Sequence, residues 1–227
     1  MQAIAAENNL SETAFLVAEG NHYALRWFTP RCEVNLCGHA TLASGFVILT
    51  ILELAKPSVR FETRSGSLGV QRDGDLLSMD FPALPPWTCA NPPAELLQSL
   101  NPAPGLVLQV KDNYFVVYEN EDQVRNARPD LTLLEKLHPF GVCVTAPGTR
   151  ADFVSRYFAP SYGIPEDPVT GSTHCSLAPY WSGRVNKKRL LARQLSQRGG
   201  EVICEPSGER VILAGRAVLY LEGSISI

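Results

Sequence analysis

The apolar positions of this 227-residue chain follow two patterns, one typical of strands and one typical of helices. Residues 13–18 and 23–29 are dense in aromatic and β-branched side chains, which predicts two neighbouring antiparallel strands. The longer apolar run 40–54 has the length of a helix and is hydrophobic on nearly every side, which predicts a central, buried helix. Residues 1–8 have the pattern of the end of an amphipathic helix.

Further strand candidates follow, and a proline-rich stretch divides them into two sets. They are residues 59–63, 66–72 and 76–81 before the stretch, then 107–110, 114–118 and 142–145 after it, with a helix at 131–137. Seven prolines lie between Pro82 and Pro104, and this density predicts a linker between two domains. We therefore expect a first lobe over residues 1–86, to which residues 216–227 return, and a second lobe over residues 87–215.

One motif of the first half returns in the second half. Arg26-Trp-Phe-Thr-Pro30 reappears as Arg156-Tyr-Phe-Ala-Pro160, each time followed by a loop, a glycine and an apolar helix. The loops end in Cys37-Gly-His39 and Thr170-Gly-Ser172, and their alignment requires three extra residues in the second loop. The sequence thus predicts an α+β fold of two pseudo-symmetric lobes, with sheet wrapped on a helix.

Charge and cysteine content exclude several classes of function. A formal net charge of −3 lacks the basic excess of nucleic-acid-binding proteins. The run 40–54 is too short and too polar to span a bilayer, and no secretory leader pattern opens the chain, so we expect a cytoplasmic protein without membrane partners. The six cysteines form no Cys-x-x-Cys pair, so we expect no zinc knuckle and mostly reduced, buried thiols.

The glycine of each repeated loop precedes a predicted helix. Free backbone N–H groups and the helix dipole make such a helix start an anion site. Gly38 and Gly171, with the neighbouring Thr170, are therefore predicted to bind a substrate carboxylate between two facing lobes. The alternative is that the glycines only supply tight turns, but their matched positions favour a binding role.

Four side chains near these loops are candidates for chemistry. His39 is expected to be neutral at its helix start and to polarise a substrate or relay a proton, unless it only caps the helix. Asp167, held extended by the proline after it, orients a substrate amine or His39, or else forms an Asx-turn. Ser172 is a candidate for substrate contact or for an N-cap. Glu12 is expected to be partly desolvated, which raises a carboxyl pKa and suits proton transfer, unless it is a solvated turn residue.

Four ordered motifs closely resemble those of the PhzF-like family of phenazine biosynthesis. They are Asn9-Leu-Ser-Glu-Thr-Ala-Phe15, Arg26-Trp-Phe-Thr-Pro30, Cys37-Gly-His-Ala-Thr-Leu42 and Glu166-Asp-Pro-Val-Thr-Gly-Ser172. The resemblance continues through residues 197–201 and 219–223 and so covers nearly the whole chain. It implies the diaminopimelate epimerase-like fold, in which each of two similar lobes curls a mostly antiparallel sheet around a central helix, and it implies a homodimer.

The resemblance also assigns roles to residues. In the phenazine enzyme the glutamate of the Asn-Leu-Ser-Glu motif, here Glu12, is the acid/base that shifts a proton on a dihydro-hydroxyanthranilate without metal or coenzyme. The resemblance likewise makes His39, Asp167 and Ser172 catalytic residues. It implies that Gly38 and Gly171 frame the substrate.

Two departures from the family pattern matter. Family members normally carry a strand and a Gly-Asn-Pro loop upstream of the helix at residues 1–8, so we expect a truncated first lobe whose activity needs testing. Related epimerases and racemases use one cysteine on each lobe. Cys37 matches one of them, but Thr170 stands at the opposite position, and its hydroxyl is far too weak an acid to be the second base, which disfavours a two-thiol racemase.

The leading hypothesis from the sequence is a cofactor-independent isomerase that needs no metal. In it, Glu12 moves a proton within a small carboxylate-bearing substrate. One alternative is an epimerase with a single cysteine, which uses Cys37 with Glu12 or Asp167. The other is a non-catalytic protein that binds a small ligand or a partner protein.

Overall fold

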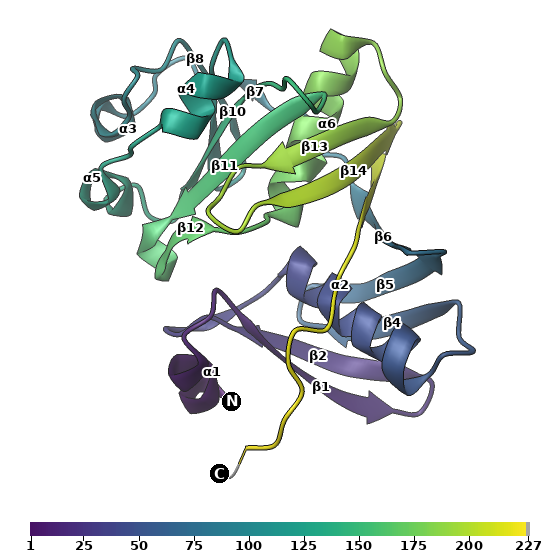
Figure 1. The fold of residues 1–227 in the computed structure, drawn as a ribbon. Coiled ribbons are helices and arrows are strands. Elements are labelled where there is room, and N and C mark those ends of the chain that lie inside the picture. The colour runs from purple at the N-terminus through teal and green to yellow at the C-terminus, as the bar shows by residue number, and fades with distance from the viewer. Residues whose placement is uncertain (226–227) are drawn as a thin grey trace.

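The structure is a computed structural model that describes residues 1–225 as two lobes (Figure 1). The first lobe comprises α1 (Gln2–Asn8), β1 (Thr13–Glu19), β2 (His22–Phe28), β3 (Glu33–Val34), α2 (Gly38–Val47), the π-helical turn η1 (Ile48–Leu52), β4 (Ser58–Thr63), β5 (Gly66–Asp73) and β6 (Leu76–Pro82). The strands expected at 13–18 and 23–29 are confirmed as β1 and β2. They pair antiparallel, from Thr13 opposite Phe28 to Glu19 opposite His22.

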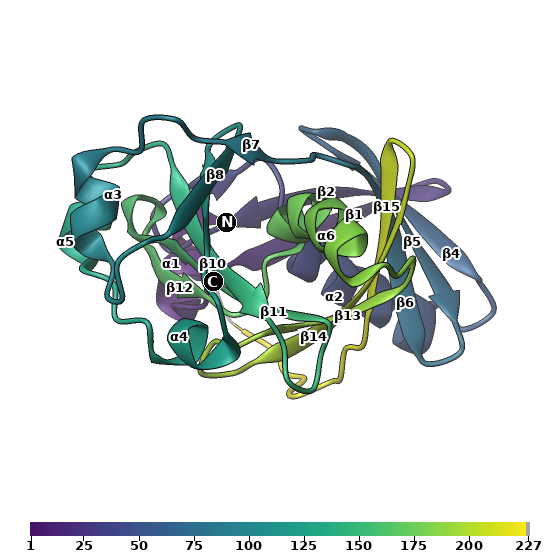
Figure 2. The same cartoon turned by 90° about the horizontal axis from the view of Figure 1, so that it is seen from above.

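The second lobe contains β7 (Trp87–Thr88), α3 (Ala94–Ser99), β8 (Leu106–Val110), β9 (Asn113–Val117), α4 (Glu121–Asn126), α5 (Leu131–Glu135), β10 (Gly141–Pro147), β11 (Phe153–Ala159), the 3₁₀ turn η2 (Pro160–Tyr162), β12 (Ile164–Asp167), α6 (Gly171–Val185), β13 (Leu190–Gln194), β14 (Gly200–Ser207) and β15 (Arg210–Gly215). The expected strands 107–110, 114–118 and 142–145 are confirmed as β8, β9 and β10. The two-lobed fold with sheet curled around the central helices α2 and α6 is the one expected (Figure 2).

The central helix of the first lobe is shorter than the apolar run predicts. The α-helix ends at Val47 and continues as η1, in which Ile48 and Leu49 are fully buried. Leu52 and Leu54 are 61% and 63% exposed, so the expected burial on nearly every side is wrong for the end of the run. The reason is that α2 rests one face on the sheet, and the chain leaves the sheet surface after η1.

One sheet runs through both lobes. β15 pairs antiparallel with β6, from Arg210 opposite Pro82 to Gly215 opposite Leu77, and it pairs with β14 on its other side. Beyond β15 the chain passes along α2 in the lower lobe of Figure 1, and Val218 and Tyr220 share a cavity with Leu42 of α2. Residues 226–227 of the expected returning segment 216–227 lie outside the described residues. The lobe boundaries themselves stay a prediction.

The repeated motif forms the same structure twice. Arg26 donates two hydrogen bonds to the carboxylate of Glu33, at 2.7 and 2.8 Å, and Arg156 donates two to Glu166, at 2.7 and 3.0 Å. The first pair is seven residues apart and the second is ten, which accounts for the expected three-residue insertion. Each guanidinium also lies over the phenylalanine two residues later, at 5.2 and 5.0 Å. The bidentate pairs fix both loops that lead into the central helices.

Two other expectations concern the whole chain. All six cysteines are free thiols, as expected, and four of them are buried. Within residues 1–225, no helix combines the length and the apolar character that crossing a bilayer requires.

Candidate active site

The two central helices begin at one cavity of about 330 Å³ between the lobes. All seven residues that the sequence singled out line this cavity: Glu12, Gly38, His39, Asp167, Thr170, Gly171 and Ser172. Cys37 lines it as well. A Cβ atom built on Gly38 would lie only 3.5 Å from the Cα of Gly171, so the two helix starts nearly touch across the cavity. Their first N–H groups therefore face one small volume, which suits an anion.

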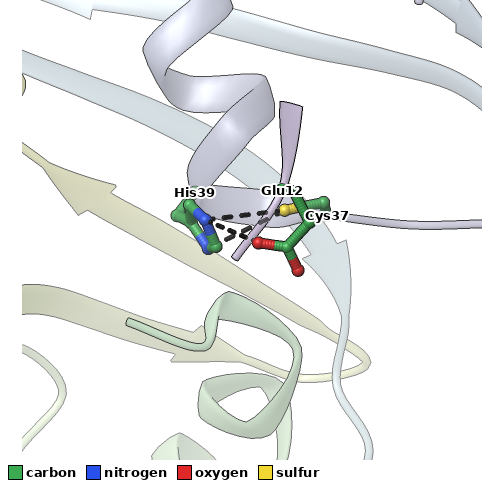
Figure 3. Close-up of side chains that lie close together, drawn as sticks. All are labelled: Glu12, Cys37 and His39. Carbon is green, nitrogen blue, oxygen red and sulfur yellow. Dashed lines mark hydrogen bonds and ion pairs between the residues drawn. The ribbon is translucent and has the colours of Figure 1, made fainter. Parts of the chain in front are cut away.

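Glu12 is held by the turn that links α1 to β1. Asn9 ends α1 in the left-handed conformation, with φ of 48°, which asparagine tolerates better than most residues. Gln2 in α1 donates hydrogen bonds to the carbonyl oxygens of Thr29 and Pro30, which ties this helix to the end of β2. The Glu12 side chain is 8% exposed, and its Oε2 lies 3.1 Å from Nε2 of His39 (Figure 3). It is thus not a solvated turn residue.

The charges of Glu12 and His39 correct two expectations. Burial alone would raise the pKa of Glu12, but the hydrogen bond and charge of His39 outweigh it, and the pKa is lowered from 4.5. Burial alone would lower the pKa of His39, but the neighbouring Cys37, Glu12 and Asp167 raise it well above 6.5. The expected raised Glu12 pKa and neutral His39 are therefore wrong, because each residue stabilises the charge of the other.

Cys37 and Thr170 stand at equivalent positions, as the N-cap residues of α2 and α6. His39 and Ser172 are each the second residue of their helix, so neither is an N-cap. The Cys37 Sγ lies 3.7 Å from Nδ1 of His39. Burial raises the pKa of the Cys37 thiol, although the His39 charge opposes this, so the thiol holds its proton more firmly than an ordinary cysteine.

Asp167 is fixed by a buried hydrogen-bond network. The Thr170 hydroxyl donates to Oδ2 of Asp167 at 2.5 Å, and the Gln194 amide donates to the Thr170 hydroxyl at 3.0 Å and to the Asp167 carbonyl at 2.7 Å. These side-chain contacts take the place of the Asx-turn considered from sequence. Oδ1 of Asp167 is buried without a hydrogen-bond partner. Burial raises the pKa of Asp167, the charge of His39 lowers it, and the charge of Glu12 raises it again, with a net rise from 3.8.

Sequence reasoning missed residues that support the site. Gln194 is 1% exposed and positions Thr170 and Asp167. Tyr157 lines the cavity and donates a hydrogen bond to Asn113 at 2.8 Å. A glutamine at an inward-facing position of an apolar strand was the available signal for Gln194, because a buried amide requires partners. Tyr157 replaces Trp27 of the first motif copy, and this difference in the repeat was a signal as well.

Three atoms that could hold a metal ion lie together in this cavity. The Sγ of Cys37, a ring nitrogen of His39 and a carboxylate oxygen of Glu12 are all within 4.8 Å of one another. The sequence spacing does not indicate this cluster, because Glu12 is distant in sequence from the other two.

Comparison with known proteins identifies the family. The family described as phenazine biosynthesis-like protein, PhzC-PhzF, matches residues 1–223.

The chain belongs to the PhzC-PhzF family.

A relative from Pseudomonas aeruginosa named an uncharacterized isomerase is 52% identical over 227 residues, which are 100% of this chain and 87% of the relative. The crystal structure of a PhzF-family protein from Enterococcus faecalis is 43% identical with a TM-score of 0.93, and the match covers 100% of this chain and 86% of that one.

A more distant structure shows how widely the fold of this PhzC-PhzF protein is shared. A predicted epimerase from Pseudomonas aeruginosa has a TM-score of 0.70 at 18% identity, over 95% of this chain and 84% of that chain. At this identity the likeness concerns the fold alone. It agrees with the diaminopimelate epimerase-like architecture of two lobes.

Proposed function

We propose that this isomerase moves a proton within a small carboxylate-bearing substrate, with Glu12 as the acid/base. The observation that carries the proposal is the Glu12 carboxylate, 3.1 Å from His39 inside the cavity where α2 and α6 begin. The isomerase class follows from the family and from the relatives named isomerases. The substrate, the proton carrier and the independence from cofactors are our proposal.

The lowered pKa of Glu12 defines which step comes first. An ionised carboxylate is ready to take a proton, so Glu12 begins as the base. The C–H bond of the substrate breaks, its electron pair moves into the neighbouring unsaturated system, and the double bond shifts. Glu12 then returns a proton to another carbon, after exchange with solvent to the degree that the cavity allows, so that no net oxidation or reduction takes place.

The substrate class rests on the positive groups of the cavity. The starts of α2 and α6 and the charged ring of His39 favour a carboxylate, and they stabilise the negative charge that develops when Glu12 removes the proton. Ser172, exposed at the second position of α6, is within the same cavity for a hydrogen bond to the substrate. Asp167 contributes the unpartnered Oδ1, which can accept from an amine or hydroxyl of the substrate.

The epimerase with a single cysteine is less well supported. Its base would be the thiolate of Cys37, yet burial raises the pKa of this thiol, which reduces the thiolate fraction at neutral pH. Replacement of Cys37 by serine tests this alternative. If Cys37 is the base, the variant loses turnover, and full turnover in the variant rejects the alternative.

The decisive experiment compares two glutamate variants in deuterated water. The probe is dihydro-hydroxyanthranilate, the compound on which the phenazine enzyme of the resembling family acts, and mass spectrometry follows deuterium in the product. Glu12→Gln keeps the size of the side chain but removes the base, so we expect turnover to fall about 10²- to 10⁴-fold. Glu7→Gln, the same change at an exposed position of α1, is the control that should leave turnover unchanged.

Unchanged turnover and labelling in Glu12→Gln would reject the mechanism. If Cys37→Ser then lost turnover, the epimerase with one cysteine would replace it. If neither substitution affected a wild-type activity, the proton carrier would lie elsewhere in the cavity. A wild-type protein that binds small carboxylates but exchanges no proton would instead support the non-catalytic alternative.

A further inference from the structure

The cluster of Glu12, Cys37 and His39 has the spacing of a zinc site. Nε2 of His39 lies 3.1 Å from Oε2 of Glu12 and 3.8 Å from the Sγ of Cys37 (Figure 3). A tetrahedral zinc with ordinary bond lengths separates its nitrogen and oxygen ligands by about 3.3 Å and its nitrogen and sulfur ligands by about 3.6 Å. Both distances agree within a few tenths of an ångström. The third pair, the Glu12 oxygen and the Cys37 Sγ, lies within 4.8 Å.

The Glu12 oxygen offers a second, independent indication of a ligand. Oε2 is buried and, within residues 1–225, its polar contact is the 3.1 Å ion pair with Nε2 of His39, with no further hydrogen-bond donor on this oxygen. The side chain is 8% exposed, so this lone pair is held away from bulk water. A carboxylate oxygen has two lone pairs, so a buried one with a single close cation has capacity for a second ligand.

The cavity leaves room for the remaining ligand. Zinc sites with three protein ligands and one open position keep water or substrate in the fourth place. Because Glu12, Cys37 and His39 all line the cavity of about 330 Å³, we expect the fourth position to face it. A water molecule or a carboxylate oxygen fits that place.

We propose that Glu12, Cys37 and His39 bind Zn²⁺ and that the bound ion reversibly inhibits the enzyme. A thiolate and an imidazole favour zinc over the hard cations Mg²⁺ and Ca²⁺. As the ion binds, the Cys37 thiol and the charged His39 ring each release one proton to solvent, so that the thiolate and the neutral ring become ligands and no redox step is involved. The inhibitory effect rests on the proposed function, because the metal takes the lone pair that Glu12 needs as the base.

Cobalt is the probe for the binding itself. Co²⁺ is titrated into the reduced 227-residue chain, and the thiolate-to-cobalt charge-transfer absorption is recorded. We expect this band in the wild type and its loss in Cys37→Ser. Binding should weaken about 100-fold or more, since loss of a supporting partner outside the ligand set already costs 10- to 100-fold.

The control is a second thiol of the same cavity. Cys32 also lines the cavity, where its Sγ contacts the Thr29 hydroxyl at 3.6 Å, and it does not belong to the cluster. Cys32→Ser should therefore keep the band and the affinity. If Cys37→Ser does not fold, as judged by circular dichroism, His39→Gln takes its place and should weaken binding while the sulfur band persists at high cobalt.

Each outcome decides one proposal separately. Absence of the band in the wild type, or a band that Cys37→Ser retains, overturns the metal site and leaves the proposed function untouched. Zinc that binds at Cys37 but raises turnover overturns the inhibitory role. If Glu12→Gln keeps full proton exchange, the proposed function fails, whereas the cobalt titration still tests the site. Inhibition by zinc that a chelator reverses, together with the band, supports the proposal.

Discussion

Gly38 and Gly171 face each other across the cavity, where a Cβ on Gly171 would lie 3.5 Å from the Cα of Gly38. This is an ordinary contact distance, so the fold has room for one methyl group. The methyl would nevertheless occupy part of the space between the two helix starts. The consequences of a substitution at Gly171 for binding and for stability can therefore be separated.

Gly171→Ala is expected to weaken carboxylate binding without unfolding the protein. A displaced hydrogen bond to a charged group is worth about 1.5–3 kcal/mol, which corresponds to a loss of about 10- to 100-fold in affinity. Calorimetric titration with a small carboxylate measures the affinity, and thermal unfolding measures the stability. Equal affinity in Gly171→Ala and the wild type would mean that the anion does not lie between the helix starts.

The ion pair of Glu12 and His39 predicts a pH-dependent stability. The folded pKa of Glu12 is lowered, so its contribution is present above 4.5 and is lost as pH falls through the folded value. The folded pKa of His39 is raised, so its contribution is full below 6.5 and is lost as pH rises through the folded value. Both contributions are complete in mildly acidic solution.

His39→Gln should therefore destabilise the protein more at about pH 6 than at about pH 9. Urea denaturation of the wild type and the variant at both pH values gives the two differences in free energy of unfolding. A difference that does not change with pH would show that His39 is not held as a cation.

His174 predicts a loss of stability in acid. Its ring is fully buried next to Phe153, and burial lowers its pKa from 6.5 to about 4, although the Thr170 carbonyl 2.8 Å from Nδ1 opposes this. The unfolded chain then binds the proton first, so stability is complete above 6.5 and falls as pH drops towards 4. The full loss is roughly 3 kcal/mol, since each unit of pKa corresponds to 1.36 kcal/mol.

Urea denaturation between about pH 7 and pH 4 measures this loss. His174→Asn keeps a donor towards the Thr170 carbonyl but does not titrate, so its acid-dependent loss should be smaller by that amount. The control, His138→Gln, replaces an exposed histidine and should keep the wild-type slope. Equal slopes in His174→Asn and the wild type would contradict the prediction.

Two helical glycines should respond in opposite ways to alanine. A Cβ on Gly45 of α2 would lie 2.6–2.9 Å from three side-chain atoms of Val70 in β5, so Gly45→Ala is expected to cost about 1–3 kcal/mol by overpacking. A Cβ on Gly183 of α6 meets nothing within 4 Å, so Gly183→Ala should stabilise the helix by up to about 1 kcal/mol. Thermal unfolding compares them, and a stabilised Gly45→Ala would refute the close packing of α2 on β5.

The sequence alone predicted the residues of the site better than their charges. The repeat around Arg26 and Arg156 revealed both helix starts because it is local. The charge of His39 was predicted wrongly because reasoning from the helix dipole left out the neighbouring Cys37, which is local, and also Glu12 and Asp167, which only the fold brings close. The pKa direction predicted for Glu12 was wrong for a matching reason, because the prediction left out the neighbouring charge of His39.

Long-range pairing was also beyond sequence reasoning. β15 has the apolar pattern of any short strand, and nothing local indicates that Leu213 pairs with Met79 of the other lobe. The end of the run 40–54 failed for a related reason. The hydrophobicity of Leu52 and Leu54 predicts that both are buried, but their exposure of 61% and 63% depends on where the chain leaves the sheet, which the local pattern does not contain.

The pairing of β6 with β15 limits how the cavity can admit a substrate. A hinge that moved whole lobes apart would strain main-chain hydrogen bonds across six residue pairs, from Arg210 with Pro82 to Gly215 with Leu77. We therefore predict that access comes from local loops, among them the turn whose Asp112 and Asn113 line the cavity. The amide of Leu213 should accordingly exchange with deuterium equally slowly with and without a bound carboxylate. The amide of Asp112 should exchange more slowly when a carboxylate is bound. In this picture the two lobes stay fixed relative to each other, and only the loops at the mouth of the cavity move.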